Sequence, residues 1–491
     1  MEIVTSEKKY LFDKTMAEIK DNKSNSLIRQ LRDFGIGPIV GMGISMLTVP
    51  VTTRLLVPEE YGKSSLFTLF QSLFLIIGLL GLDQGYVRYY NDKETDRTTL
   101  FQNALFYPLI FCAVLISVCI VFLKPISTFL FGSVEVGLMI AFCFFIPILL
   151  LNRFFLLQIR MDLRGKIYSF LNVISQVITF GILVTLLVYY QKSFRSIVYA
   201  TILGMCVNTF LCFLFCNKDF LKTKFNYSKD LQVRLLKFSL PLVPATLLSW
   251  LLNSFDKVGL RAWSDFNQLG LYSAAFKIVA LLNVFQNIFS TTWIPVAYKW
   301  HEDNVPNKKF EDISTIVLAV MVLLFSFILV FRDVIMLFLG SEYRNTARVF
   351  VFLLFVPVMY TVSETTSLGI GFAKKTMYSL YVAMVAVILN LIGNYILIPK
   401  YGAEGAAITT CVSYIVFFWG RTLFSRKVWF KFKLGRFCIN ILFLLAFGIN
   451  MLIWQNKILE ILILALVIIF NGFLVLRVFQ NRKYNSQIIS E

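Results

Sequence analysis

The sequence is divided into long apolar runs that are separated by short polar connections. Runs of about 20 apolar residues match the length that an α-helix needs to cross a bilayer. The pattern predicts fourteen such spans, which begin near residues 34, 64, 99, 137, 167, 196, 238, 269, 313, 346, 376, 404, 437 and 457. No connection is long enough for an extramembrane domain. We therefore predict an all-α polytopic membrane protein with about 14 transmembrane helices.

The composition is that of a membrane protein, and the positions of the basic residues explain the net charge. Hydrophobic residues make up 58% of the chain and charged residues 15%, and the mean hydropathy is +0.73. The net charge of +19 does not indicate nucleic-acid binding, because most of the 47 Lys and Arg fall on connections that share one side of the membrane. Basic connections stay in the cytoplasm. This predicts a multi-pass protein of the cytoplasmic (inner) membrane with both termini cytoplasmic.

A weak internal repeat suggests how the spans are grouped. The segment TRLLVPEEYGKSSLFTLF resembles LRAWSDFNQLGLYSAAF, so that Arg54 corresponds to Arg261 and Gly62 to Gly270. Six spans separate the two copies, and an even number of spans makes the two halves parallel. The predicted domains are an N-terminal cytoplasmic segment (1–33), an N-lobe with spans 1 to 6 (34–216), a cytoplasmic linker (217–237), a C-lobe with spans 7 to 12 (238–424), spans 13 and 14 (437–478) and a cytoplasmic tail (479–491).

Two apolar spans between residues 238 and 298 carry an unusual number of charges. Asp256, Lys257, Arg261 and Lys277 lie within them or at their ends. A charge at the centre of a bilayer costs about 2.5–3.5 kcal/mol on insertion scales, so these side chains do not face lipid. The polar residues of the first span recur three or four apart and share one face of the helix. The pattern predicts one wall of a wet, mainly cationic cavity.

Four motifs in order resemble a known family. They are TRLLVPEEYG, GLDQGYVRYY, NSFDKVGLRAWSDFNQLGLYSAAFKI and LIPKYGAEGAAITT. Together they are similar to bacterial oligosaccharide flippases, the polysaccharide-transport branch of the multidrug, oligosaccharidyl-lipid and polysaccharide exporter superfamily. The similarity covers roughly residues 30 to 425, and spans 13 and 14 carry no matching motif. It implies two parallel six-helix lobes facing each other in a V. It also implies that the chain carries a polyprenyl-diphosphate-linked oligosaccharide from the inner to the outer leaflet by alternating access, for surface polysaccharide such as O-antigen or capsule.

Basic residues within or near the spans are candidates for binding the diphosphate. Arg and Lys suit this group because ionic hydrogen bonds strengthen where water is scarce. The candidates are Arg54, Arg88, Arg153, Lys257, Arg261 and Lys277. For Arg54, Arg88 and Arg261, which lie near span ends, an alternative is that they reach the lipid headgroups as anchors.

Acidic residues within spans are candidates for carrying a coupling proton or cation. They are Asp83, Asp256 and Glu364. Glu364 is favoured because it has no cation close in sequence. Asp256 lies beside Lys257, and for it we favour the alternative that it only neutralises a neighbouring charge across the cavity. Asn390 and Asn394 lie one helical turn apart, where they bind sugar hydroxyls or, as we favour, tie helices together.

Several chemistries are excluded by the residues present. The only histidine, His301, lies in a connection between predicted spans, which leaves no His-based triad or zinc site within the membrane. We expect no cofactor, no enzymatic activity and no nucleic-acid partner. The expected partners are the lipid-linked oligosaccharide, membrane lipids and other polysaccharide-assembly membrane proteins.

Two alternative functions remain open at this point. An ion-coupled multidrug exporter of the same superfamily would be expected to have an acidic cavity for cationic substrates, whereas the predicted cavity is mainly basic. A membrane glycan polymerase or ligase would need a sizeable outer loop to carry its catalytic groups, and the predicted outer loops are short.

Overall fold

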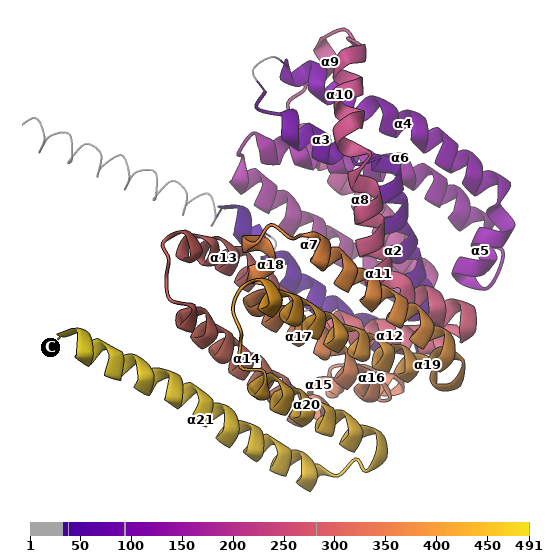
Figure 1. Cartoon of the computed structure of the whole chain (residues 1–491). Coiled ribbons are helices and arrows are strands. Elements are labelled where there is room, and N and C mark those ends of the chain that lie inside the picture. Colours follow the sequence, from indigo (N-terminus) through magenta and orange to yellow (C-terminus); the bar gives the residue numbers. More distant parts are fainter. Residues whose placement is uncertain (1–32, 38, 93–94, 281, 491) are drawn as a thin grey trace, which may run out of the picture. The chain divides into compact units, whose positions relative to one another are not determined.

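The computed structural model describes residues 33–37, 39–92, 95–280 and 282–490, and all regular elements in these residues are helices (Figure 1). Within these residues, twelve helices are long and apolar enough to cross a membrane. All fourteen predicted segments lie on helices. The counts differ because α19 (Met377–Val428) covers two predicted spans, and another is divided between α12 (Phe266–Val279) and α13 (Leu282–Glu302). The all-α polytopic fold is confirmed, while the V arrangement stays a prediction.

The chain forms two compact units. The first contains the described residues up to Thr48 and Phe67–Ser249, and the second contains Val49–Leu66 and the residues from Trp250 onward. The predicted linker, residues 217–237, therefore lies inside the first unit, and the corner between the first two spans belongs to the second unit.

The first unit is built around long helices that pack through aromatic side chains. Helix α6 packs against α4 and α8, and α7 packs against α8. Phe67 and Phe142 are fully buried and meet edge to face, with ring centroids 5.5 Å apart. The helices of this unit are the first helix (Asp33–Leu55, as far as Thr48), α2 (Pro58–Leu79, from Phe67), α3 (Leu82–Tyr89), α4 (Arg97–Val121), α5 (Leu123–Phe131), α6 (Val136–Met161), α7 (Gly165–Tyr189), α8 (Phe194–Phe215), α9 (Asp219–Lys222), α10 (Lys229–Ser239) and the start of α11 (Leu242–Trp263).

The linker is fixed to α4 by a buried amide. Asn103 is 0% exposed, and its Nδ2 donates to the carbonyl of Asn226 at 2.8 Å. Its Oδ1 accepts from the backbone N–H of Ser228 at 3.1 Å, and Gln232 Nε2 donates to its carbonyl at 2.7 Å. The linker is therefore packed against α4 as part of the first unit.

Helices α2 and α3 are separated by a two-residue break that lies against the end of α10. Helix α2 ends before Leu80 and Gly81, which have φ values of 50° and 71°, and α3 begins directly after them. A Cβ on Gly81 would lie 2.6 Å from the carbonyl oxygen of Ser239, the last residue of α10. Glycine is required at Gly81 both for the left-handed backbone and for this close approach.

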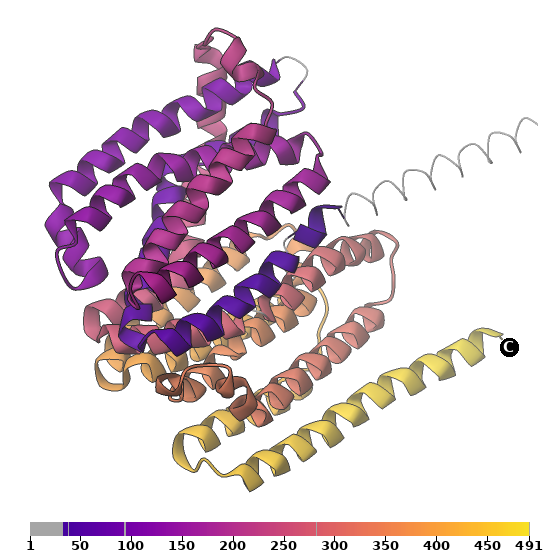
Figure 2. The same cartoon turned by 180° about the vertical axis from the view of Figure 1, so that it is seen from behind.

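The second unit packs two layers of helices against each other and carries α20 and α21 at its side. Helix α17 packs against α19 and α14, α12 packs against α16, and α21 lies beside α14 (Figures 1 and 2). The buried Arg332 and Glu460 form an ion pair at 2.6 Å that ties α15 to α21. The helices of this unit are the rest of α11, α12, α13, α14 (Asn307–Val330), α15 (Arg332–Leu337), η1 (Ser341–Tyr343), α16 (Thr346–Leu353), α17 (Phe355–Thr366), α18 (Leu368–Phe372), α19, α20 (Gly435–Ile453) and α21 (Lys457–Ser490).

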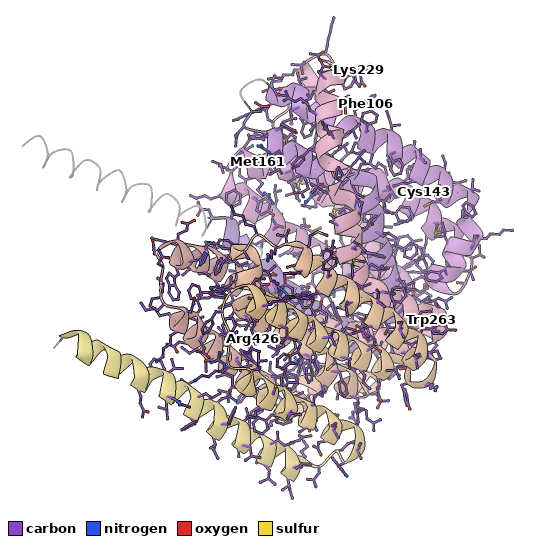
Figure 3. The ribbon with its side chains drawn as sticks, in the orientation of Figure 1. Phe106, Cys143, Met161, Lys229, Trp263 and Arg426 are labelled. Atoms are coloured by element: carbon purple, nitrogen blue, oxygen red, sulfur yellow. The ribbon has the colours of Figure 1, made fainter. Side chains whose placement is uncertain are left out.

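Helix α19 turns at Gly402 without a loop. Gly402 has φ 53° and ψ −128°, which are not helical values. Its backbone lies against Gln268, whose Oε1 accepts a hydrogen bond from the N–H of Ala403 at 3.0 Å. Trp263, labelled in Figure 3 at the end of α11, packs edge-on against Tyr395 before this turn, with ring centroids 5.6 Å apart.

The two segments of the weak repeat contact each other through their corresponding glycines. A Cβ on Gly62 would lie 2.2 Å from the carbonyl oxygen of Phe266, and a Cβ on Gly270 would lie 1.8 Å from that of Pro58. Because Gly62 corresponds to Gly270, and Pro58 then corresponds to Phe266, the contact is reciprocal. A two-fold relation between the repeats produces this pattern.

Candidate functional site

Asp256, on the part of α11 that belongs to the second unit, is held by four neutral donors from two other helices. Its side chain is 3% exposed. Its Oδ1 accepts from Asn390 Nδ2 at 3.1 Å and from Asn394 Nδ2 at 2.6 Å, both on α19. Its Oδ2 accepts from Tyr272 Oη on α12 at 2.5 Å and from Thr410 Oγ1 on α19 at 2.7 Å. The carboxylate thereby joins α11, α12 and both halves of α19.

This arrangement keeps a charge where a charge is costly. Neutral donors stabilise a carboxylate without cancelling it. Among the described residues, no Lys or Arg forms an ion pair with Asp256 within 4.0 Å. The buried Oδ1 of Asn394 also has no hydrogen-bond partner. These hydrogen bonds stabilise the ionised carboxylate, so a proton or a small cation binds it only when one of the donors turns away.

Two lysines lie beside this site on facing helices. Lys257 directly follows Asp256 on α11, and its Nζ lies 5.2 Å from the ring centroid of Phe276 on α12. Lys277 follows Phe276 on α12 and is exposed, whereas Lys257 is half-buried. Within the described part of the chain, neither lysine forms an ion pair or a hydrogen bond. Two neighbouring cations that form no ion pair are an arrangement that an anionic ligand would stabilise.

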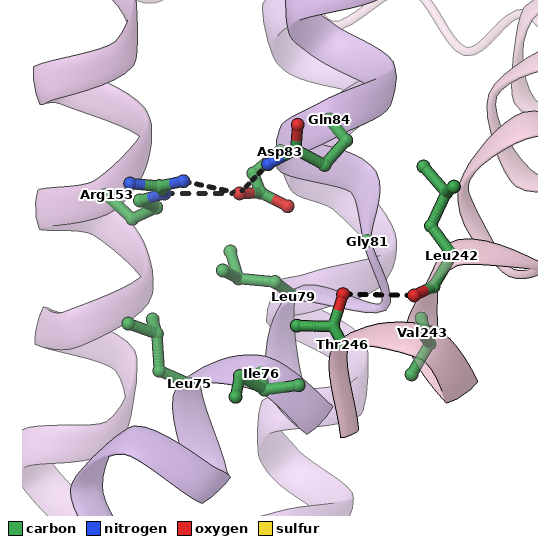
Figure 4. A pocket seen from close by; sticks show the side chains of 10 residues that line it. All are labelled: Leu75, Ile76, Leu79, Gly81, Asp83, Gln84, Arg153, Leu242, Val243 and Thr246. Carbon is green, nitrogen blue, oxygen red and sulfur yellow. Dashed lines mark hydrogen bonds and ion pairs between the residues drawn. The ribbon is translucent and has the colours of Figure 1, made fainter. Parts of the chain in front are cut away.

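The first unit carries a second polar site, in a cavity of about 270 Å³ between α2, α3, α6 and the start of α11 (Figure 4). Arg153 of α6 donates to Asp83 Oδ2 from Nε at 3.2 Å and from Nη2 at 2.8 Å, and Gln84 donates to the same oxygen at 3.2 Å. The break at Gly81 places Asp83 in the first turn of α3, where the helix dipole favours a carboxylate. The remaining lining is mostly Leu, Ile and Val. Two predicted site residues, Arg153 and Asp83, are thus brought together as an ion pair.

The three candidates near span ends make other contacts. Arg54 is exposed, and its Nη2 donates to the carbonyl of Leu337 at the end of α15, at 3.1 Å. Arg88 is also exposed, on α3. Arg261 is half-buried, and its guanidinium lies 4.3 Å from the ring centroid of Phe266. Arg261 falls one turn after Lys257 on the same face of α11, and is the candidate of these three that extends the lysine pair.

The structure adds a partner for Glu364 that the sequence did not indicate. Glu364 has no cation close in sequence, but Arg421 of α19 donates to its Oε1 at 2.7 Å, and both side chains are largely buried. Asp256, interpreted from sequence as a partner of a neighbouring cation, is the carboxylate without an ion pair. Asn390 and Asn394 tie α19 to α11, as the favoured alternative predicted.

His301 and the acidic residues offer no metal centre. His301 lies in the last turn of α13, and not in a loop as the sequence pattern indicated, and its exposed ring stacks on Phe372 with centroids 4.0 Å apart. Among the described residues, no group of three His, Cys, Asp or Glu side chains is placed to hold a metal ion.

Comparison with known proteins identifies the family. The profile of the family described as "Polysaccharide biosynthesis protein" matches residues 35–301, more than half of the chain. This chain belongs to the polysaccharide biosynthesis protein family. The matched part of this family member contains both the Asp83–Arg153 pair and the Asp256–Lys257–Lys277 region.

Relatives and solved structures agree with this assignment. This chain is 24% identical over 391 residues to "Probable low-salt glycan biosynthesis flippase Agl15" of Haloferax volcanii. The aligned region covers 78% of this chain and 79% of that protein. The fold of this chain is similar to that of the lipid II flippase MurJ in an inward closed conformation, with a TM-score of 0.66, 18% identity and coverage of 92% and 99% of the two chains. It is also similar to an inward-facing multidrug resistance MATE transporter of the MOP superfamily, with a TM-score of 0.58, 18% identity and coverage of 80% and 97%. The family profile confirms the predicted resemblance to a polysaccharide-transport family, and the solved structures show that the fold is shared.

Proposed function

We propose that this chain is a flippase that moves a polyprenyl-diphosphate-linked oligosaccharide from the inner to the outer leaflet of the cytoplasmic membrane, for surface polysaccharide synthesis. Its family, its glycan-flippase relative and its transporter fold support transport and not catalysis. Both termini are cytoplasmic in this proposal, and the transporter works by alternating access.

The observation that supports the proposal is the pair Lys257 and Lys277, neither of which forms an ion pair, beside a carboxylate that four neutral donors hold. Asp256 takes its four hydrogen bonds from Tyr272, Asn390, Asn394 and Thr410, which leaves the lysine charges for a ligand. A diphosphate supplies the two negative charges that adjacent ammonium groups require. The polyprenyl tail stays in lipid.

Asp256 is the residue that we assign to ion coupling in this proposal. It lies next to Lys257 in the sequence, so a proton or cation at Asp256 changes the electrostatic potential at the diphosphate site. Asp83 and Glu364 each have an arginine partner, Arg153 and Arg421 respectively, and are weaker candidates for this role.

Transport of a defined substrate into one leaflet tests the proposal. The protein is reconstituted into vesicles that contain a polyprenyl-diphosphate-linked oligosaccharide, and a membrane-impermeant glycosidase reports the sugar that reaches the outer leaflet. We expect Lys257→Ala and Lys277→Ala to lose most of this transport while folded protein is retained. The control Lys308→Ala removes an exposed lysine at the start of α14 and is expected to transport normally. Normal transport by both site variants would contradict the proposal.

A further inference from the structure

A row of side chains runs along α19 away from the Asp256 site. Thr410, Tyr414, Phe417 and Arg421 are spaced four, three and four residues apart, which places them on one face of the helix. At a rise of 1.5 Å per residue this row is about 16 Å long. Its first member, Thr410, donates to Asp256, and the other three have no part in that site.

The middle of the row is aromatic and connects three helices. Tyr414 Oη donates to Asn253 Oδ1 on α11 at 3.5 Å, one turn before Lys257. The Tyr414 and Phe417 ring centroids are 6.0 Å apart. Phe417 is stacked with Tyr360 of α17, with centroids 6.0 Å apart and an interplanar angle of 14°.

The far end of the row is a fixed cation. The Arg421 guanidinium lies 5.2 Å from the Phe417 centroid and 5.7 Å from the Tyr360 centroid. Its Nη1 donates to Ser363 Oγ at 2.8 Å and to Glu364 Oε1 at 2.7 Å. These contacts hold the arginine over the two rings and leave its other N–H groups available to a ligand.

This row is not a sealed core, and it is not a lipid-facing surface. Asn253 is exposed, and Tyr360 and Phe417 are half-buried although both lie in helices long and apolar enough to cross a membrane. Arg421 and Glu364 at its end are too costly to face hydrocarbon. Partly exposed rings beside a few fixed polar groups are the lining that ligand sites have.

We propose that Tyr360, Tyr414 and Phe417, with Asn253, Arg421 and Glu364 at their edges, form the subsite for the sugar rings of the transported lipid. This aromatic row begins beside Lys257, where the diphosphate would bind, and the first sugar is attached directly to that diphosphate. The C–H face of a pyranose packs on an aromatic ring, while its hydroxyls exchange hydrogen bonds with amide, guanidinium and carboxylate groups. The subsite rests on the proposed function, and assigns the glycan to the second unit.

Binding of lipids with and without sugar separates the two parts of the substrate. The purified full chain in nanodiscs is titrated with undecaprenyl diphosphate, and with the same lipid carrying one to three hexose or N-acetylhexosamine rings. We expect wild type to bind a sugar-bearing lipid more tightly than the bare lipid. Tyr360→Ala and Phe417→Ala are expected to lose up to about tenfold of this gain while binding of the bare lipid is unchanged.

Two matched variants show whether the rings act through stacking. Tyr360→Phe keeps the ring and is expected to keep the gain. Phe473→Ala removes a ring that is 60% exposed on α21, and is expected to behave as wild type.

The outcomes distinguish the subsite from the proposed function. The subsite is overturned if the tighter binding of sugar-bearing lipid persists in both Tyr360→Ala and Phe417→Ala. It is also overturned if wild type binds every sugar-bearing lipid no better than the bare lipid. Either result leaves the flippase proposal standing. Failure of wild type to bind any of these polyprenyl diphosphates overturns both.

Discussion

The reciprocal glycine contact in the second unit makes Gly270 one of the least replaceable positions in the chain. In Gly270→Ala the new Cβ would lie 1.8 Å from the carbonyl oxygen of Pro58, and 3.0 Å from its Cα. Restoring an ordinary contact of 3.4 Å requires the two backbones to separate by about 1.6 Å. No flexible side chain is available to yield, so the helices themselves must move. Overpacking typically costs about 1–3 kcal/mol, and we expect about 3 kcal/mol here because the obstacle is backbone.

Heat-induced unfolding of the purified protein, followed by intrinsic fluorescence, measures this loss. In Gly62→Ala the new Cβ would lie 2.2 Å from the Phe266 carbonyl oxygen, and we expect a similar loss of unfolding free energy. The double variant is expected to lose less than the sum of the two, because one separation of the helices relieves both clashes. The control is Gly181→Ala in α7, where nothing lies within 4 Å of the new Cβ. There we expect no loss, or a gain of up to about 1 kcal/mol from helix propensity. A Gly270→Ala protein as stable as Gly181→Ala would refute the reasoning.

Three further predictions concern single side chains. Asp256→Asn is expected to remove the dependence of transport on a proton or cation gradient, and a gradient dependence equal to wild type would exclude Asp256 as the coupling residue. Asp83→Asn leaves the partly exposed Arg153 with a neutral partner and is expected to lower the free energy of unfolding by about 1 kcal/mol, measured by thermal unfolding. Asn103→Ala removes the anchor of the linker, so trypsin should cleave residues 217–237 faster, whereas Asn172→Ala, whose amide bonds its own helix, should leave cleavage unchanged.

The fold was predictable from the sequence to the extent that it depends on hydrophobic pattern. All fourteen predicted segments are helical, because an apolar run of bilayer length has no other way to satisfy its backbone. The interruptions were not predicted. Leu80–Gly81 breaks a continuous apolar run, and Gly402 turns α19 within a polar connection. Sequence could not predict either break, because each depends on the close approach of another backbone or side chain.

The site was predictable by residue type but not by partner. Helical spacing placed Lys257 and Lys277 on polar faces, yet it could not show that Arg421, 57 residues away in sequence, would pair with Glu364. The importance of Asp256 was underestimated for the same reason, since its donors come from α12 and from two separate turns of α19. Periodicity identifies the face of a helix, and only packing decides what that face meets.

The chain passes from one unit to the other at residues 48–49, 66–67 and 249–250, and each passage falls within a helix. A movement of one unit relative to the other therefore has to bend these three helices, because the passages between the units are helical and not loops. Pro50 lies within a turn of the first passage and Pro244 within two turns of the third, where a missing backbone donor lowers resistance to bending. In the proposed transport cycle, a substitution that stiffens or loosens one of these three helices would change turnover and leave substrate affinity unaltered.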